Sequence, residues 1–72
     1  MKYNGHRSWN AWNISLWLNN EEPTYRYMVS LIQQYGRRKA ARLLANELAG
    51  QSTPDGARYN QTCIYEAMED LT

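Results

Sequence analysis

The sequence has only one cysteine and one histidine. Because Cys63 has no second cysteine to pair with, no disulfide can form within the chain, and we expect a reducing compartment with this thiol as a small core residue. A lone Cys63 and a lone His6 also give no cluster of metal ligands with a recognisable spacing. No GxSxG, Walker or Rossmann pattern occurs. We therefore predict no metal site, no cofactor, no catalytic residue and no enzyme activity.

Long apolar runs and a strong excess of one charge are missing too. No segment approaches the ~20 apolar residues of a membrane span, and the opening letters MKYNGHRS lack the apolar core of a secretory signal. The net charge is +1, from eight Lys/Arg against seven Asp/Glu, which excludes an acidic DNA mimic and a uniformly basic nucleic-acid coat. We expect a cytoplasmic protein that does not contact membranes.

Aromatic residues are abundant by comparison, with three Trp and six Tyr in 72 residues. All three Trp lie in residues 8–20, SWNAWNISLWLNN, and this segment carries no charge. A chain of this length forms one domain and buries only about 60% of the surface that it exposes when unfolded. Some of the rings should therefore remain at the surface, where Tyr and Trp favour interfaces.

Capping residues and apolar spacing predict an all-α fold, a compact bundle of about four short helices. Ser8 and Asn20 are good N-caps for the first two helices, and Gly36 and Gly50 are placed to end the second and third. Pro54-Asp55-Gly56 is a turn before the last helix. The helices are expected over residues 9–19, 21–35, 37–49 and 59–71. Their apolar stripes are Tyr25, Met28, Leu31, Ile32 and Tyr35, then Ala41, Leu44, Ala45 and Leu48, then Cys63, Ile64, Ala67, Met68 and Leu71.

The first expected helix is apolar on two opposite sides. One side carries Trp9, Trp12, Asn13, Leu16 and Trp17, and the other carries Ala11, Ile14 and Leu18. We expect the Trp side to pack inward, where a buried Asn13 would need hydrogen-bond partners. The other side would either be covered by the chain's own fourth helix, so that the helix is buried all round, or stay open as a second interface for a partner or for a second copy in a homodimer. Alternating apolar residues over 12–18 also fit a strand, but the Ser8 cap and the lack of a partner strand favour a helix.

Four of the eight basic residues fall within six positions, at Arg37, Arg38, Lys39 and Arg42. They open the expected helix over 37–49, where cations oppose the helix dipole at a cost of about 0.3–1 kcal/mol each. Charges that oppose the helix dipole in this way can mark a functional site. A helix start that carries basic residues is suited to binding phosphate or the carboxylates of a partner. The alternative is a solvated face that contributes little.

Other residues bear on how this cluster is used. Glu66, Glu69 and Asp70 near the end of the last helix could pair with it instead of a partner. Tyr27 and Tyr65 lie beside their stripes and are the aromatic residues expected to contact a partner.

The stretch RRKAARLLANEL has the spacing of the first helix of a helix-turn-helix, but the helix after it has three acids and no Lys or Arg, and would repel phosphates. Nucleic acid is therefore the less favoured partner.

The run WNISLWLNNEE, followed by Tyr25 and Arg26, resembles the WNxxLWxxN(D/E)E-like opening of small uncharacterised proteins of bacteriophages, and TPDGARY is similar as well. The resemblance brings no catalytic or binding residue with it. It implies a setting, because short phage proteins without enzyme motifs often act by binding a host protein, and inhibitors of bacterial defence such as anti-CRISPR proteins are one such class. We expect a binding protein that occupies a surface of a host protein complex in the bacterial cytoplasm.

Overall fold

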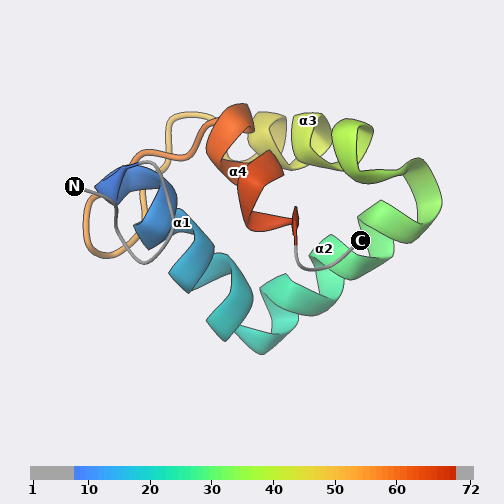
Figure 1. Ribbon diagram of the computed structural model, residues 1–72, viewed down its shortest axis with the longest axis horizontal. Coiled ribbons are helices and arrows are strands. Elements are labelled where there is room, and N and C mark those ends of the chain that lie inside the picture. The colour runs from blue at the N-terminus through green and yellow to red at the C-terminus, as the bar shows by residue number, and fades with distance from the viewer. Residues whose placement is uncertain (1–7, 70–72) are drawn as a thin grey trace.

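The computed structural model describes residues 8–69, and this range contains four α-helices. They are α1 (Trp9–Asn20), α2 (Glu22–Tyr35), α3 (Arg37–Glu47) and α4 (Gln61–Ala67). Helices α1 and α2 form a V, α3 runs back across its open end, and α4 lies between α1 and α3 and packs against both (Figure 1). The predicted all-α bundle is confirmed. Residues 12–18 are helical, so the strand alternative is wrong.

Local signals explain where the first two helices begin and end. Ser8 caps α1 as predicted, because its side chain accepts a hydrogen bond from the Ala11 N–H at 3.1 Å. Asn20 does not cap α2: α1 continues through Asn20, and Glu21, in an extended conformation, holds the cap position. Gly36 separates α2 from α3 with a φ of +85°, which residues with a side chain rarely adopt.

Helices α3 and α4 are shorter than the predicted 37–49 and 59–71. After Glu47 the backbone tightens into a turn that includes Gly50, whose φ is +81°. Helix α4 begins only at Gln61, because the Asn60 side chain accepts the Cys63 N–H and so caps the helix there. The predicted end of this helix, with Leu71, lies outside the described residues. Within residues 8–69, no helix has both the length and the apolar character that crossing a membrane requires.

The core between the helices is built largely from small side chains. Buried alanines come from three helices and from the segment between α3 and α4: Ala11, Ala40, Ala41, Ala57 and Ala67. The larger buried side chains are Ile14, Leu18, Met28, Leu31, Leu44, Cys63, Ile64 and Met68. Alanines at these positions allow the helices to approach closely, and a close-packed interior has no room for bulky rings.

Helix α1 faces the core with the side opposite to the predicted one. Ala11 and Ile14 are fully buried and Leu18 is 1% exposed, whereas Trp9 is 38% and Leu16 37% exposed. The prediction of a second interface on Ala11, Ile14 and Leu18 is therefore wrong, because the chain itself covers that side. The small and branched side chains fit the alanine-lined core and the indole rings do not.

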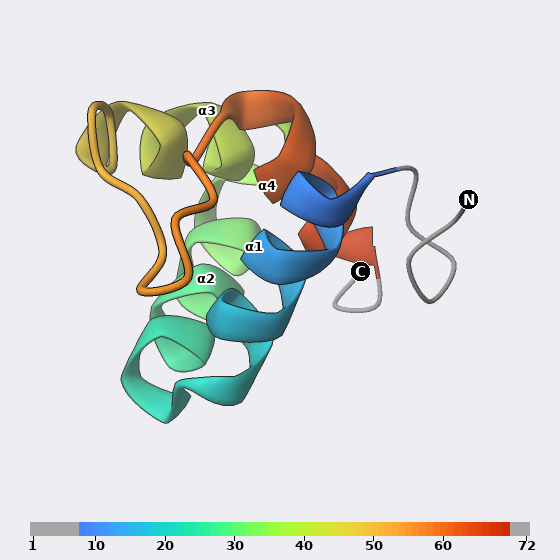
Figure 2. The ribbon, with the colours of Figure 1, turned by 90° about the vertical axis from the view of Figure 1, so that its left-hand side faces the viewer.

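Side-chain hydrogen bonds fasten the segment 48–60 to α1. Asn13, which is 1% exposed, donates from Nδ2 to Asp55 Oδ2 at 2.8 Å and accepts at Oδ1 from the Thr53 hydroxyl at 2.6 Å. The Trp17 indole N–H donates to the same Asp55 oxygen at 2.9 Å. Asn13 thus has the partners that a buried amide requires. Figure 2 shows the segment running from α3 down to α1 and back up to α4.

We predict that Asp55 makes the fold sensitive to acid. The pKa of its carboxyl lies below the ordinary 3.8. The hydrogen bond from Asn13 is the largest cause, and the hydrogen bond from Trp17 is the second. A carboxyl whose pKa is lower in the folded chain stabilises the fold above its unfolded pKa, and this stabilisation is lost as the pH falls through the folded pKa. In thermal unfolding from neutral pH down to below pH 3.8, Asp55→Asn should start at a lower Tm and fall less with acid. Parallel curves for the two proteins would contradict this role.

Candidate functional site

The charges of α3 are arranged against the helix dipole at both ends. Its first turn holds only basic residues, with Arg42 one turn further on, and its last turn holds Glu47 and no basic residue. The dipole favours the reverse order, so each exposed charge costs about 0.3–1 kcal/mol. The N-cap Gly36 has no side chain to bind the free N–H groups of the first turn. The sequence of α3 is therefore not optimised for helix stability, and the surface it presents needs another explanation.

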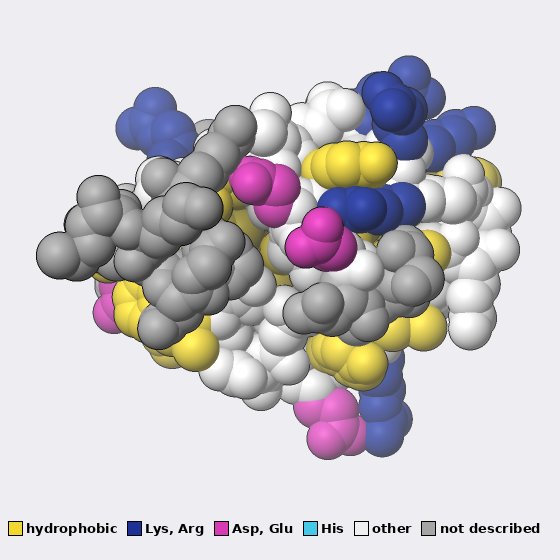
Figure 3. All heavy atoms as spheres, viewed as in Figure 1, with side chains coloured by type: hydrophobic (Ala, Val, Ile, Leu, Met, Phe, Trp, Pro, Cys, Tyr) yellow, Lys and Arg dark blue, Asp and Glu magenta, His cyan; other side chains and the backbone are white. Residues whose placement is uncertain are grey.

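The basic residues surround a hollow at the corner where α2 meets α3. It has a volume of about 470 Å³ and is lined by Tyr35, Gly36, Arg37, Arg38, Lys39, Arg42 and Gln61. A smaller hollow of about 260 Å³ adjoins it through Arg38 and Gln61 and adds Thr62 and Tyr65. Among residues 8–69, no Asp or Glu lines either hollow. Figure 3 shows dark blue side chains gathered at the upper right, over this end of α3.

Arg37 is the member of the cluster that the fold itself uses. It is half-buried, and its guanidinium carbon lies 3.8 Å from the centroid of the Tyr65 ring. Its Nε and Nη2 both donate to the Tyr65 backbone carbonyl, at 3.0 and 2.8 Å. That carbonyl belongs to the last turn of α4, where carbonyls lack a full set of helical partners and where the dipole favours a cation. Arg37 therefore joins the start of α3 to the end of α4.

We expect Arg37→Ala to destabilise the fold, with Arg38→Ala as its matched control. Losing two charge-assisted hydrogen bonds and a stacked ring should cost about 1–3 kcal/mol. Because Arg38 is exposed, Arg38→Ala should lower the free energy of unfolding by less than about 0.5 kcal/mol. Urea unfolding of both variants measures the difference. Equal costs would mean that the contact between Arg37 and Tyr65 contributes nothing to stability.

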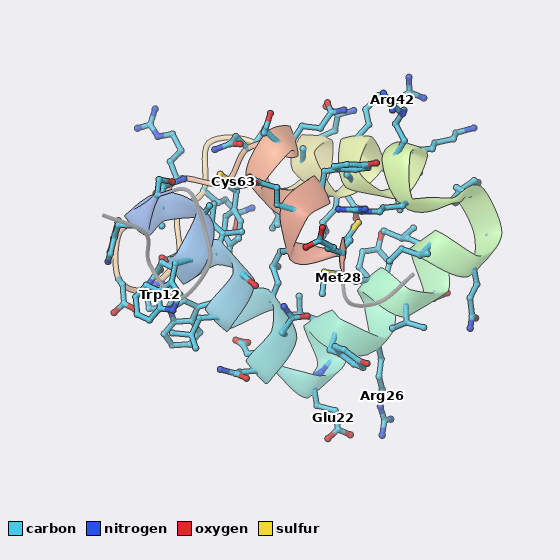
Figure 4. The ribbon with its side chains drawn as sticks, in the orientation of Figure 1. Trp12, Glu22, Arg26, Met28, Arg42 and Cys63 are labelled. Atoms are coloured by element: carbon cyan, nitrogen blue, oxygen red, sulfur yellow. The ribbon has the colours of Figure 1, made fainter. Side chains whose placement is uncertain are left out.

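The accessible part of the cluster is made by Arg38, Lys39 and Arg42, which are all exposed, and we call these three residues the basic corner. The Arg38 guanidinium carbon lies 5.9 Å from the Tyr65 ring centroid, and Lys39 Nζ lies 5.2 Å from that of Tyr35. Arg42 follows Arg38 by one turn and points out into solvent (Figure 4). Like charges at this spacing repel each other by a few tenths of a kcal/mol. Cations held together beside aromatic rings suit the recognition of an anionic surface.

The remaining residues predicted at this site lie elsewhere or outside the described range. Tyr27 is exposed but donates its hydroxyl to Glu47, at the other end of α3. Asp70 lies outside the described residues. Glu66 and Glu69 have interaction partners of their own, and their pairing with the cluster stays a prediction. Four residues that line the two hollows were not predicted at this site: Tyr35, Gly36, Gln61 and Thr62. The position of Tyr35, directly before the glycine that ends α2, is the sequence signal that could have indicated it.

A second exposed surface is the aromatic side of α1. Trp9 and Leu16 are exposed, and Trp12 and Trp17 are half-buried. Trp12 lies on the side of α1 away from α4 (Figure 4). A hollow of about 230 Å³ is lined by Leu16, Trp17 and Asn20. The sequence predicts this side of α1 in the core, because large rings usually dominate small cores.

The single thiol has the predicted place in the core. Cys63 is buried, and its sulfur lies 3.7 Å from the Asn10 amide nitrogen that donates to it. Within residues 8–69, no three His, Cys, Asp or Glu side chains form a group that could hold a metal ion. His6 lies outside the described residues.

Comparison with known proteins places the chain in a family without assigning a function. The model of a family of unknown function, DUF7249, matches residues 1–72, so the chain belongs to that family. Comparisons with curated proteins and with solved structures found no significant match.

Proposed function

We propose that this member of a family of unknown function is a small binding protein that acts by occupying a surface of a host protein complex. The basic corner carries the proposal, because Arg38, Lys39 and Arg42 are exposed together and no Asp or Glu among residues 8–69 lines the hollows around them. Arginine and aromatic residues supply most of the binding energy in protein interfaces. The surface it occupies should be rich in carboxylates, since charge complementarity speeds encounter and fixes register.

The proposed setting is the cytoplasm of a bacterium infected by a phage. Its support is the resemblance of WNISLWLNNEE to the opening of bacteriophage proteins. Within that setting, an inhibitor of a bacterial defence complex of the anti-CRISPR type is the function we favour. An inhibitor that blocks a surface requires a rigid contact area and no reacting group, and the basic corner lies on a helix that is packed against α2 and α4.

Capture from a bacterial lysate tests the proposal when it is run with matched variants. The parent and an Arg58→Glu control, which changes an exposed arginine outside the corner, should capture the same acidic-surfaced protein. The double variant Arg38→Glu, Arg42→Glu should not. The captured protein is then purified and titrated against all three. Equal binding by the double variant and the control would overturn the proposal.

The same cations support a second candidate, a nucleic-acid-binding accessory protein. The rings of Tyr35 and Tyr65 lie beside Lys39 and Arg38, and bases stack on aromatic rings in sites of this kind. Three phosphate contacts predict that log K falls with log salt at a slope of roughly −2 to −3. Anisotropy titrations of labelled DNA and RNA at two salt concentrations measure this slope. No binding at the lower salt concentration would remove this candidate.

A further inference from the structure

A groove near the C-terminal end of α3 differs from the basic corner in charge. It has a volume of about 410 Å³ and lies among α1, the first half of α2, the end of α3 and the segment before α4. Leu18 and Leu44 line it and are buried, so they form its apolar base. Tyr27 and Glu47 are exposed and form its rim, and Tyr59 is a half-buried wall.

The electrostatics of this groove favour a cation. Among residues 8–69, no Lys or Arg lines it, whereas Glu47 does. The groove lies at the C-terminus of α3, where the helix dipole is negative. The faces of the Tyr27 and Tyr59 rings attract cations as well. Glu47, the end of α3 and the two tyrosines all border the same groove.

The pKa values of both tyrosine hydroxyls at the groove are raised, for partly different reasons. The pKa of Tyr27 is raised first by its hydrogen bond to Glu47, then by desolvation, and then by the charge of that carboxylate. The pKa of Tyr59 is raised by burial first and then by the charge of Glu21. The carboxylates of Glu47 and Glu21 therefore act on the two tyrosines that line the groove. The bond from Tyr27 uses only part of the acceptor capacity of Glu47, since an ionised carboxylate accepts about four hydrogen bonds.

We propose that this groove binds a cationic side chain, arginine or lysine, of a partner protein. Both side chains combine an apolar stem with a charged head. The stem would lie over Leu44 and Leu48, and the head would lie at Glu47 between the rings of Tyr27 and Tyr59. The site shares no residue with the basic corner. It is therefore independent of the proposed function, and each can fail without the other.

An NMR titration of the intact chain tests the proposal with simple probes. The probes are N-acetyl-arginine amide, N-acetyl-lysine amide and, as the neutral control, N-acetyl-norleucine amide. The two cationic probes should shift the backbone amide signals of Thr24, Tyr27, Glu47, Leu48 and Tyr59 in a saturable way. Norleucine amide should bind more weakly at the same signals. Absence of localised shifts with either cation, or equal binding of the neutral probe, would overturn the proposal.

A matched pair of variants separates charge from shape. Glu47→Gln keeps an oxygen that can accept the hydrogen bond from Tyr27. It should lower the affinity of the arginine probe by roughly threefold, the size expected for an exposed ion pair. Glu22→Gln removes an exposed carboxylate that pairs with Arg26 outside the groove and should leave the affinity unchanged. The spectra themselves report whether each variant is folded. An unchanged affinity in a folded Glu47→Gln variant would also overturn the proposal.

Discussion

Reversing all three charges of the basic corner, with Arg38→Glu, Lys39→Glu and Arg42→Glu combined, is expected to abolish partner binding and to raise thermal stability. Three carboxylates facing an acidic surface cost several kcal/mol, which corresponds to a loss of at least about 100-fold in affinity. The new acidic residues at positions 38 and 39 suit the helix dipole in the first turn of α3, by about 0.3–1 kcal/mol each. Loss of binding and gain of stability in one protein is a combination that damage to the fold cannot produce.

The design depends on leaving Arg37 unchanged, because it holds α3 to α4. Reversal of Arg26 and Arg58, which are exposed outside the corner, is the control for a general loss of positive charge and should keep the affinity within a few-fold. Thermal unfolding and titration of the captured partner supply the two readouts. A triple variant that binds like the parent would remove the corner from the mechanism. A lower Tm would show that these three residues, like Arg37, support the fold.

The opposite charges at the two ends of α3 have a common consequence. With eleven residues, the helix is about 16 Å long. One partner could therefore meet the basic corner with its carboxylates and place an arginine or lysine in the groove at Glu47. Each end opposes the dipole, so α3 gives up some stability at both. A helix selected only for folding would not carry Arg38, Lys39 and Arg42 at its start, because of the basic residues there only Arg37 holds α3 to α4.

Much of the fold could be predicted because its signals are local. The Ser8 cap and the glycine between α2 and α3 mark element ends through backbone chemistry, and both are where the sequence places them. The stripes of α2 to α4 correctly indicated Met28, Leu44 and Ile64 as core. The cation cluster was visible in the sequence as well. The sequence did not show that Arg37 has a structural role while the basic corner is exposed, because the contact between Arg37 and Tyr65 joins residues 28 positions apart.

The orientation of α1 could not be predicted from its periodicity. When two opposite sides of a helix are apolar, spacing alone does not say which side packs inward, and the size of the side chains then misleads. The space available is set by the alanines of the other elements, such as Ala40, Ala57 and Ala67, which only the assembled fold brings together. The hydrogen bonds from Asn13 and Trp17 to Asp55 are likewise non-local, and they hold the polar segment 48–60 against α1.

This orientation predicts a large difference between two identical substitutions in one helix. Leu18→Ala should cost about 2–5 kcal/mol, because Leu18 is 1% exposed and a close-packed core cannot fully collapse around the cavity. Leu16→Ala should cost less than about 1 kcal/mol, since Leu16 is 37% exposed. A domain of this size has a total stability of roughly 4–11 kcal/mol, so the first change removes a large part of it.

Urea unfolding monitored by tryptophan fluorescence and by circular dichroism gives both values under the same conditions. The two variants share residue type, helix and change in helix propensity, so their difference reports burial alone. Comparable losses in both would contradict the observed orientation, and a larger loss for Leu16→Ala would restore the Trp side of α1 to the core. If Leu18→Ala alone is destabilised, the rings of Trp9 and Trp12 lie on an accessible surface that adjoins no charge within α1.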